Sequence, residues 1–550
     1  MTKNMSNIIP GFKKFIDKNS FLVILTLFIL WMCIGIFPLR CYETDGQEII
    51  LGCDIMYREG WSIPPVYSYA YRMQPLTTFI VVALKHLLPF LTCEQIYCFL
   101  TAVAALFFLI GSISFARHIT HASSSMILLA AILLPEMYAI AMYPNTAIPA
   151  AACFVWALIF ITRENYLLSS FLLIISVLFR LDIVTVFPAV IPLLVYQGKS
   201  LRRMFNLATV YGLIVLVVTG FLYWILKTDI FGTYEEYQRN GPMIPPASRI
   251  LAVVGFYSVA YFVLLPIGVG VIIAKKRWKE LFVVLLPILI IHYVFASFGN
   301  ASKHFLYNAP FAIIAGTRAL EWICCQLRRH VVLKWGTAVA IVLFMTVSVR
   351  KWNLSMPWLY KNPLSKVGVL MPLYETERGN TGYSVGVGAG FQLCTNDENM
   401  LLTGHLFYPW YIREIKELLG DWRKQQKTVI DKVPTSNILI LEYGASAPIS
   451  FELMTEENRF KLLENMPETY RYTISNQQRD LHFWRIVMPD AITESKQIVS
   501  YIDGVLQDFP EGEVYLLAAA NHYGASYFMD ELVSMGKLEK KADRLYKILR

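Results

Sequence analysis

Residues 41–76 read CYETDGQEIILGCDIMYREGWSIPPVYSYAYRMQPL, a stretch too polar to cross a bilayer. It carries several carboxylates, two arginines and many aromatic side chains, and it follows a strongly apolar run over residues 21–37. That run has about the length that spans a bilayer, and no small-residue cleavage site follows it. We therefore predict an uncleaved first transmembrane helix with its amino end in the cytoplasm, followed by a first extracytoplasmic loop at residues 41–76.

Composition predicts that most of the chain lies in lipid. Of 550 residues, 56% are hydrophobic and 16% are charged, whereas about 25% are charged in soluble domains. The mean hydropathy is +0.48. The net charge is +9, but the Lys and Arg residues fall in short clusters between apolar runs, as membrane topology requires, so nucleic-acid binding is not predicted.

Cysteine and carboxylate spacing predicts no metal centre. The nine cysteines contain no CxxC pair, so no zinc or iron–sulfur motif is present in the sequence. Asp45 with Glu48 could hold a divalent ion, but two carboxylates fall short of the six or so oxygens that such ions prefer. Cys41 and Cys53 could pair in an oxidising compartment.

Apolar runs and the charges between them predict about 11 transmembrane helices. Residues 75–90 form a short apolar run with Lys85 and His86, which favours an interfacial or re-entrant helix. The basic clusters GKSLRR, KKRWK and QLRRH all fall on the side that the alternation assigns to the cytoplasm. Besides residues 21–37, the predicted spans are 96–115, 126–142, 148–161, 167–179, 184–196, 208–226, 251–274, 281–298, 308–325 and 339–349.

The pattern changes at residue 351, after the last span. Residues 1–350 are predicted to form the transmembrane domain, and residues 351–550 lie outside by the same alternation. Strand-like runs such as NILILEY (437–443) and LHFWRIV (481–487) alternate there with helical patterns at 410–426 and 528–549. This alternation predicts an extracytoplasmic α/β domain.

Charged residues gather at the outer membrane surface. Asp45 and Glu48 come directly after the first span, and the outer ends of later spans add Arg180, Lys303 and His304. This arrangement suits transfer of a group from a phosphate-linked lipid, because a carboxylate can take the acceptor proton while cations hold the departing phosphate. The simpler interpretation is that loop charges are solvated and that helix-end cations lie among lipid headgroups.

The order of these features resembles the GT-C superfamily of membrane glycosyltransferases, which includes protein O-mannosyltransferases and the enzymes that add aminoarabinose to lipid A. Asp45 in YETDGQEI matches the first residue of that family's acidic pair, and Gly46 replaces the usual Glu. The resemblance covers about residues 20–350. The other similar segments are YRMQPLTTFIVVALKHLL (71–88), YPNTAIPAA (143–151), FRLD (179–182) and SKHFLYNAPF (302–311).

The resemblance implies a polyprenyl-phosphate sugar donor, inversion at the anomeric carbon and a bacterial inner-membrane location, with an acceptor that it does not identify. Asp45 would be the base, with Glu48 and Glu43 as alternatives. No cofactor is implied. The residues predicted to hold the phosphate are Arg72, Arg180, Lys303 and His304, and those predicted to stack on the sugar or lipid are Trp61, Tyr69, Tyr71 and Tyr307.

Two other functions remain open at this stage. A transporter or flippase of a lipid-linked sugar would use the same cations, although the chain shows no internal repeat and its ionisable residues gather at one surface. A non-catalytic envelope assembly protein would use the outer domain to bind partners.

Overall fold

The computed structural model describes residues 21–41, 44–60, 74–134, 137, 141–142, 144–225, 261, 263–295 and 302–326. Beyond residue 350 it describes ten strands, two helices with their adjoining turns, and single residues between 413 and 432. For Asp45, Glu48, Lys303 and His304 the description is limited to the backbone.

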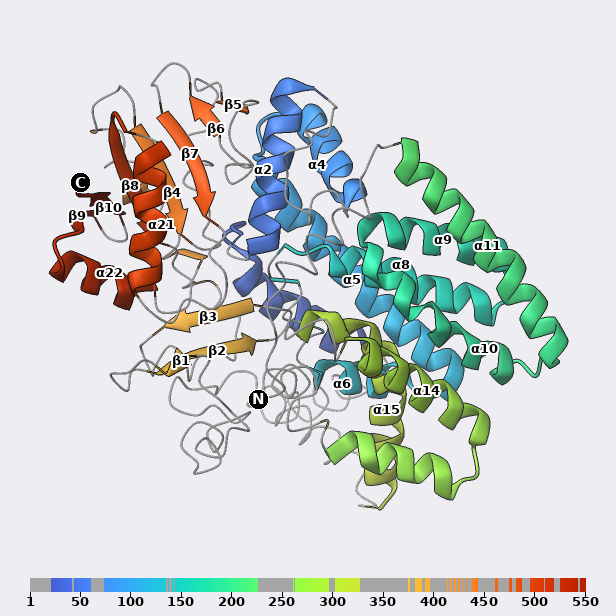
Figure 1. The fold of residues 1–550 in the computed structure, drawn as a ribbon. Coiled ribbons are helices and arrows are strands. Elements are labelled where there is room, and N and C mark those ends of the chain that lie inside the picture. The colour runs from blue at the N-terminus through green and yellow to red at the C-terminus, as the bar shows by residue number, and fades with distance from the viewer. Residues whose placement is uncertain are drawn as a thin grey trace, which may run out of the picture.

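Most of the predicted apolar runs form helices near their expected bounds. α8 and α9 pack on each other, α5 packs on α8, and α15 packs on both α5 and α6; Figure 1 shows these helices grouped together with α11 along one flank. The helices at predicted spans are Phe21–Ile36, α5 (Cys93–Thr120), α8 (Ala147–Thr162), α9 (Tyr166–Phe179), α11 (Leu201–Ile225), α14 (Trp278–Phe295) and α15 (Ala309–Gln326).

Exposed apolar side chains cover α11. Only 11% of its most apolar window is buried, and Val217, Phe221 and Trp224 are among its exposed residues. Such a surface is costly in water, so it suits contact with lipid. By length and composition, two of the described helices could cross a membrane, at Cys93–Thr120 and Arg202–Ile225, and six further apolar helices are shorter.

Two predicted spans differ from the structure because of proline. Instead of a helix over 126–142, α6 (Ser124–Ile132) ends in a turn at Leu133 and Leu134, directly before Pro135, which disfavours helical geometry in the preceding residue. Instead of one helix over 184–196, the chain forms the 3₁₀ helix η1 (Leu181–Val190) and the short α10 (Ile191–Tyr196). Pro188 and Pro192 cannot donate helical hydrogen bonds.

Two further predicted spans are only partly covered. Of residues 251–274, the structure describes Tyr261 and the helix Val263–Ala274. Residues 339–349 lie outside the described residues. The predicted number of eleven spans therefore stays a prediction.

The stretch of residues 41–76, predicted to be a loop, contains a helix, α2 (Thr44–Glu59). Gly46, Ile49, Ile50, Cys53 and Met56 are buried at spacings that place them on one helical face. This face packs on α4 (Pro75–Leu87), which confirms the short helix predicted there, and on α5. No disulfide joins Cys41 and Cys53, which are both buried.

A seven-stranded sheet forms in the carboxy-terminal third, with strand order β5-β6-β7-β4-β8-β10-β9. β4 pairs in parallel with β7 and β8, and the outer pairs are antiparallel. Figure 1 shows this sheet with helices α21 (Ser495–Asp508) and α22 (Ala525–Ser534). Its strands are β4 (Ile438–Tyr443), β5 (Phe460–Leu462), β6 (Ile474–Asn476), β7 (Leu481–Ile486), β8 (Glu513–Ala518), β9 (Leu538–Ala542) and β10 (Leu545–Ile548). The strands predicted at NILILEY and LHFWRIV are confirmed as β4 and β7.

A second, antiparallel sheet joins β1 (Tyr374–Glu375), β2 (Thr381–Val387) and β3 (Phe391–Thr395) in that order.

The helix predicted over 528–549 is wrong beyond residue 534. Gly536 adopts φ +69° after α22, a conformation that favours glycine. The amide of Lys537 donates to the Leu532 carbonyl at 3.0 Å, and the amide of Gly536 donates to that of Val533 at 3.0 Å, which closes a Schellman motif. The chain then turns into the β9–β10 hairpin.

Candidate functional site

Three segments that are far apart in the sequence meet at Arg180, the residue that follows α9. Its Nε donates to Oδ2 of Asp182 at 2.8 Å, in the first turn of η1. Its Nη1 donates to Oγ1 of Thr146 at 3.5 Å, at the amino end of α8. Tyr307, in the 3₁₀ helix η2 (Ser302–Asn308), lies within electrostatic reach of the same guanidinium.

Tyr307 is fully buried where η2 packs on α8. Its ring meets that of Phe154 edge to face, with centroids 6.1 Å apart. Burial raises the pKa of the Tyr307 hydroxyl, the Asp182 carboxylate raises it further, and the Arg180 guanidinium lowers it. The phenol therefore stays protonated next to an ion pair and can donate a hydrogen bond.

Local structure explains why Thr146 and Arg180 face each other. Oδ1 of Asn145 accepts the Ala147 amide at 2.6 Å, which fixes the turn before α8. Ser176 of α9 donates its hydroxyl to the Ala150 carbonyl of α8 at 2.7 Å. These two bonds hold the start of α8 against the end of α9.

The other side of η2 is held by α14. The ring centroids of His292 and Phe305 lie 5.0 Å apart. Nδ1 of His292 is 3.1 Å from the side-chain nitrogen Nδ2 of Asn308, a residue that is fully buried. Because η2 is fixed from both sides, Tyr307 is presented to Arg180 in a defined position.

The structure brings some of the predicted site residues together, and the site itself stays a prediction. Arg180 and Tyr307 lie together, and Lys303 and His304 belong to the same short helix as Tyr307. Asp45 and Glu48 belong to the first part of α2, which packs on α4, and α4 in turn packs on α9. The predicted residues Glu43, Trp61, Tyr69, Tyr71 and Arg72 lie outside the described residues.

Sequence reasoning left Asp182 and Thr146 out of the predicted site. Both belong to segments already singled out by the resemblance, FRLD and YPNTAIPAA, so a signal was present. What the sequence lacked was the pairing between the two segments. Among the residues that the structure describes, no three His, Cys, Asp or Glu side chains lie together in a way that could hold a metal ion.

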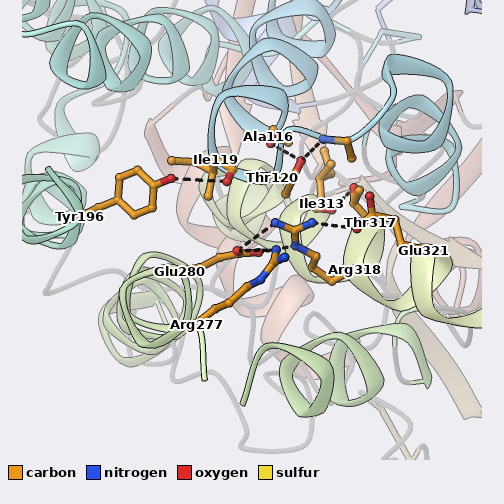
Figure 2. A network of polar contacts seen from close by, with 11 residues as sticks. Ala116, Ile119, Thr120, Tyr196, Arg277, Glu280, Ile313, Thr317, Arg318 and Glu321 are labelled. Carbon is orange, nitrogen blue, oxygen red and sulfur yellow. Dashed lines mark hydrogen bonds and ion pairs between the residues drawn. The ribbon is translucent and has the colours of Figure 1, made fainter. Parts of the chain in front are cut away.

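A second arginine cluster lies farther along α15. Arg318 donates from Nε and Nη2 to the two carboxylate oxygens of Glu280 in α14, at 2.6 and 3.0 Å. Arg318 also pairs with Glu321 at 2.8 Å, and Arg277 pairs with Glu280 at 3.4 Å. Figure 2 shows this network enclosed between α5, α14 and α15. It adjoins the KKRWK cluster, on the side predicted to be cytoplasmic.

Comparison with known proteins bears on the fold. No protein-family profile and no curated protein sequence matches the chain. The chain is similar to the crystal structure of ArnT from Cupriavidus metallidurans bound to undecaprenyl phosphate, with a TM-score of 0.56 and 12% identity. The similarity covers 95% of this chain and 97% of the ArnT chain. The chain has the fold of ArnT.

The apo state of ArnT from the same organism gives the same result, with a TM-score of 0.55, 11% identity and coverage of 97% of this chain and 98% of the ArnT chain. The sequence resemblance is thereby matched at the level of the fold, by two structures of ArnT. The ArnT fold also extends beyond residue 350, where the sequence resemblance ended.

Proposed function

We propose that this protein is a glycosyltransferase that moves a sugar from a polyprenyl-phosphate-linked donor to an acceptor on the extracytoplasmic face of the membrane. The observation that carries the proposal is the meeting of Thr146, Arg180 and Tyr307 in a chain with the ArnT fold. Each comes from a segment that the GT-C resemblance had singled out. A crystal structure of ArnT contains undecaprenyl phosphate, which is a polyprenyl phosphate.

The donor phosphate needs more positive charge than Arg180 alone supplies. Asp182 offsets the charge of Arg180, and the pair together is close to neutral. Lys303 and His304, on the same helix as Tyr307, would add the cations that hold the phosphate as it departs with the bonding electrons. Arg72 is the further candidate from the first extracytoplasmic stretch.

The acceptor would be activated by Asp45. Its backbone lies in the first turn of α2. As the acceptor oxygen bonds to the anomeric carbon with inversion, the sugar–phosphate bond breaks and the acceptor proton passes to the carboxylate. A carboxylate with an ordinary pKa of about 4 acts mainly by its position and by proton transfer late in the reaction.

The remaining roles are those that the sequence resemblance implies. Glu48 and Glu43 are the alternative bases, and Trp61, Tyr69 and Tyr71 would stack on the sugar or the lipid. The chain would lie in a bacterial inner membrane, with its carboxy-terminal α/β region on the outer side.

The test is a transfer assay with purified protein, a radiolabelled polyprenyl-phosphate sugar and a cell-envelope extract. We expect label on an acceptor with the wild-type protein, and a rate lower by about 10³-fold or more in Asp45→Asn, within the range of general acid–base effects. Glu59→Gln, at the other end of α2, is the matched control and should retain activity. Label that stays on the lipid with wild type overturns the proposal, and full activity in Asp45→Asn excludes Asp45 as the base.

A further inference from the structure

Lys416 reaches from the carboxy-terminal region to the end of the first transmembrane helix. Its Nζ donates to the carbonyls of Gly35 and Ile36, each at 2.9 Å, and these residues are 381 and 380 positions away. The last carbonyls of a helix have no partner within the helix, and a cation there also complements the helix dipole. Lys416 is 1% exposed, so this contact is enclosed by protein.

Glu94 holds the chain a few residues further on. Oε1 of Glu94 accepts the Cys41 amide at 2.7 Å, and Oε2 accepts Nη1 of Arg40 at 3.1 Å. Glu94 lies in the first turn of α5, whose start is fixed by a capping box between Thr92 and Gln95. Cys41 is thereby tied to the start of α5.

The two contacts enclose the segment of residues 37–41, which connects the first helix to α2. Gly420, four residues after Lys416, also lies beside this segment, because a Cβ on Gly420 would be 3.8 Å from Nε of Arg40. Neighbouring cations of the Lys416 helix behave differently. Arg413 and Lys424 are 53% and 73% exposed and pair with carboxylates of their own helix.

A buried ammonium is an expensive way to stabilise a fold. Removing a charge from water costs several kcal/mol even after relaxation, and an apolar side chain of similar volume carries no such penalty. What the ammonium adds over an apolar side chain is direction, because it must face the carbonyls of Gly35 and Ile36. The contact therefore specifies where the first helix ends.

We propose that Lys416 and Glu94 are positioning residues for sugar transfer, which fix residues 37–41 and thereby the first turn of α2, where Asp45 lies. This inference rests on the proposed function of Asp45. Asp45 lies four positions after Cys41, a span of at most about 14 Å. The carboxy-terminal region would then contribute to the reaction through the start of α2.

The test uses the full chain and a thiol probe that does not depend on activity. Cys41 is buried in the segment of residues 37–41, and Cys53 of α2 and Cys93 of α5 are also buried. We expect Lys416→Met to raise the rate of N-ethylmaleimide modification at Cys41, measured by peptide mass spectrometry, by about 10-fold or more, as for a local opening equilibrium. Cys53 and Cys93 should stay protected.

In the transfer assay, kcat of Lys416→Met should fall by about 10-fold while KM for the lipid donor stays unchanged, because the contact acts on the geometry of the base. Lys424→Met is the matched control, from an exposed cation of the same helix, and should change neither readout. Glu94→Gln gives a second variant with the same expected pattern if Lys416→Met folds poorly.

Each other outcome overturns the inference. Modification of Cys53 and Cys93 together with Cys41 would mean that Lys416 supports the fold as a whole. Protection of Cys41 in both variants would mean that the segment is not held by these contacts, and a raised Cys41 rate with unchanged kcat would remove the positioning role. Failure of transfer in the wild-type protein would overturn the proposed function instead. The thiol result would still show whether Lys416 and Glu94 hold residues 37–41 in place.

Discussion

One arginine cluster joins α14 to α15 at Arg318, another lies between α8, α9 and η1 at Arg180, and the two differ in how completely their charges are paired. Arg318 and Glu280 are each 6% exposed and share two hydrogen bonds, with Glu321 and Arg277 completing the network. Arg180 and Asp182 are 11% and 27% exposed, and a single bond of 2.8 Å joins them, with a longer contact to Thr146.

The difference indicates different roles. The Arg318 network has carboxylates of its own on two helices, so it joins those helices. The Arg180 cluster is more accessible, contains one carboxylate and lies against η2, which carries Lys303 and His304. A site for an anionic group needs cations that a ligand can reach, and Arg180, at 11% exposed, fits that need better than Arg318 at 6%.

The largest expected effect comes from breaking the Arg318 network. Arg318→Met leaves Glu280 buried without its main partner, and loss of one member of a buried pair costs about 3–5 kcal/mol. Thermal unfolding of detergent-solubilised protein should show a strong loss of stability. Arg277→Met, which removes a 41%-exposed partner at 3.4 Å, is the control and should cost about 1 kcal/mol or less. An Arg318→Met variant that melts like wild type would contradict the structural role.

The next largest effect is expected from the Arg180 cluster. Arg180→Gln should lower transfer by about 10²-fold, which is typical for loss of one group that stabilises developing charge. Its loss of stability should be smaller than that of Arg318→Met, because Asp182 is more exposed to water than Glu280. The measurement is a rate with polyprenyl-phosphate sugar beside a melting curve of the same preparation. Unimpaired transfer with a large loss of stability would give Arg180 the role assigned here to Arg318.

The smallest expected effect is a pH dependence of stability caused by Lys416, a buried cation whose hydrogen bonds go to backbone carbonyls. Burial lowers the pKa of Lys416 to about 8 in the folded protein, while the nearby Cys98, Cys41 and Glu94 raise it. The folded state therefore binds fewer protons than the unfolded state between pH 8 and the ordinary lysine pKa of about 10.4. The free energy of unfolding must therefore rise with pH across that window. Below pH 8 the folded protein carries the full cost of burying a charged ammonium, and above pH 8 it loses that charge.

The free energy of unfolding of the wild type, relative to that of Lys416→Met, should accordingly rise by about 1 kcal/mol between pH 8 and pH 9. Melting temperatures of the two proteins at both pH values measure this gain. A difference that is constant with pH would show that Lys416 does not change its charge there.

The sequence predicted the fold class because the information was local. Apolar runs of bilayer length and the basic clusters between them require no knowledge of distant contacts, and α5, α8, α9 and α15 formed near the expected bounds. The strands β4 and β7 were predicted for the same reason. The errors at 126–142 and 184–196 were also local in origin, since proline can end a helix inside an apolar run.

The candidate site could be predicted only as separate segments. Hydropathy and motif order selected Arg180 and Tyr307, but neither indicated that Asp182 would offset one charge or that Thr146 would complete the cluster. Arg318 and Glu280 were not selected at all, because two charges 38 residues apart give no sign in the sequence that they pair.

By itself, then, the sequence determined which segments are apolar enough for lipid and where the basic clusters fall between them. The tertiary structure decided which charges neutralise each other and that Lys416 ends the first helix from 381 positions away. It also decided that residues 41–76 contain the helix α2. The physical reason is that burial and pairing depend on packing between distant elements, whereas hydropathy is a property of each segment alone.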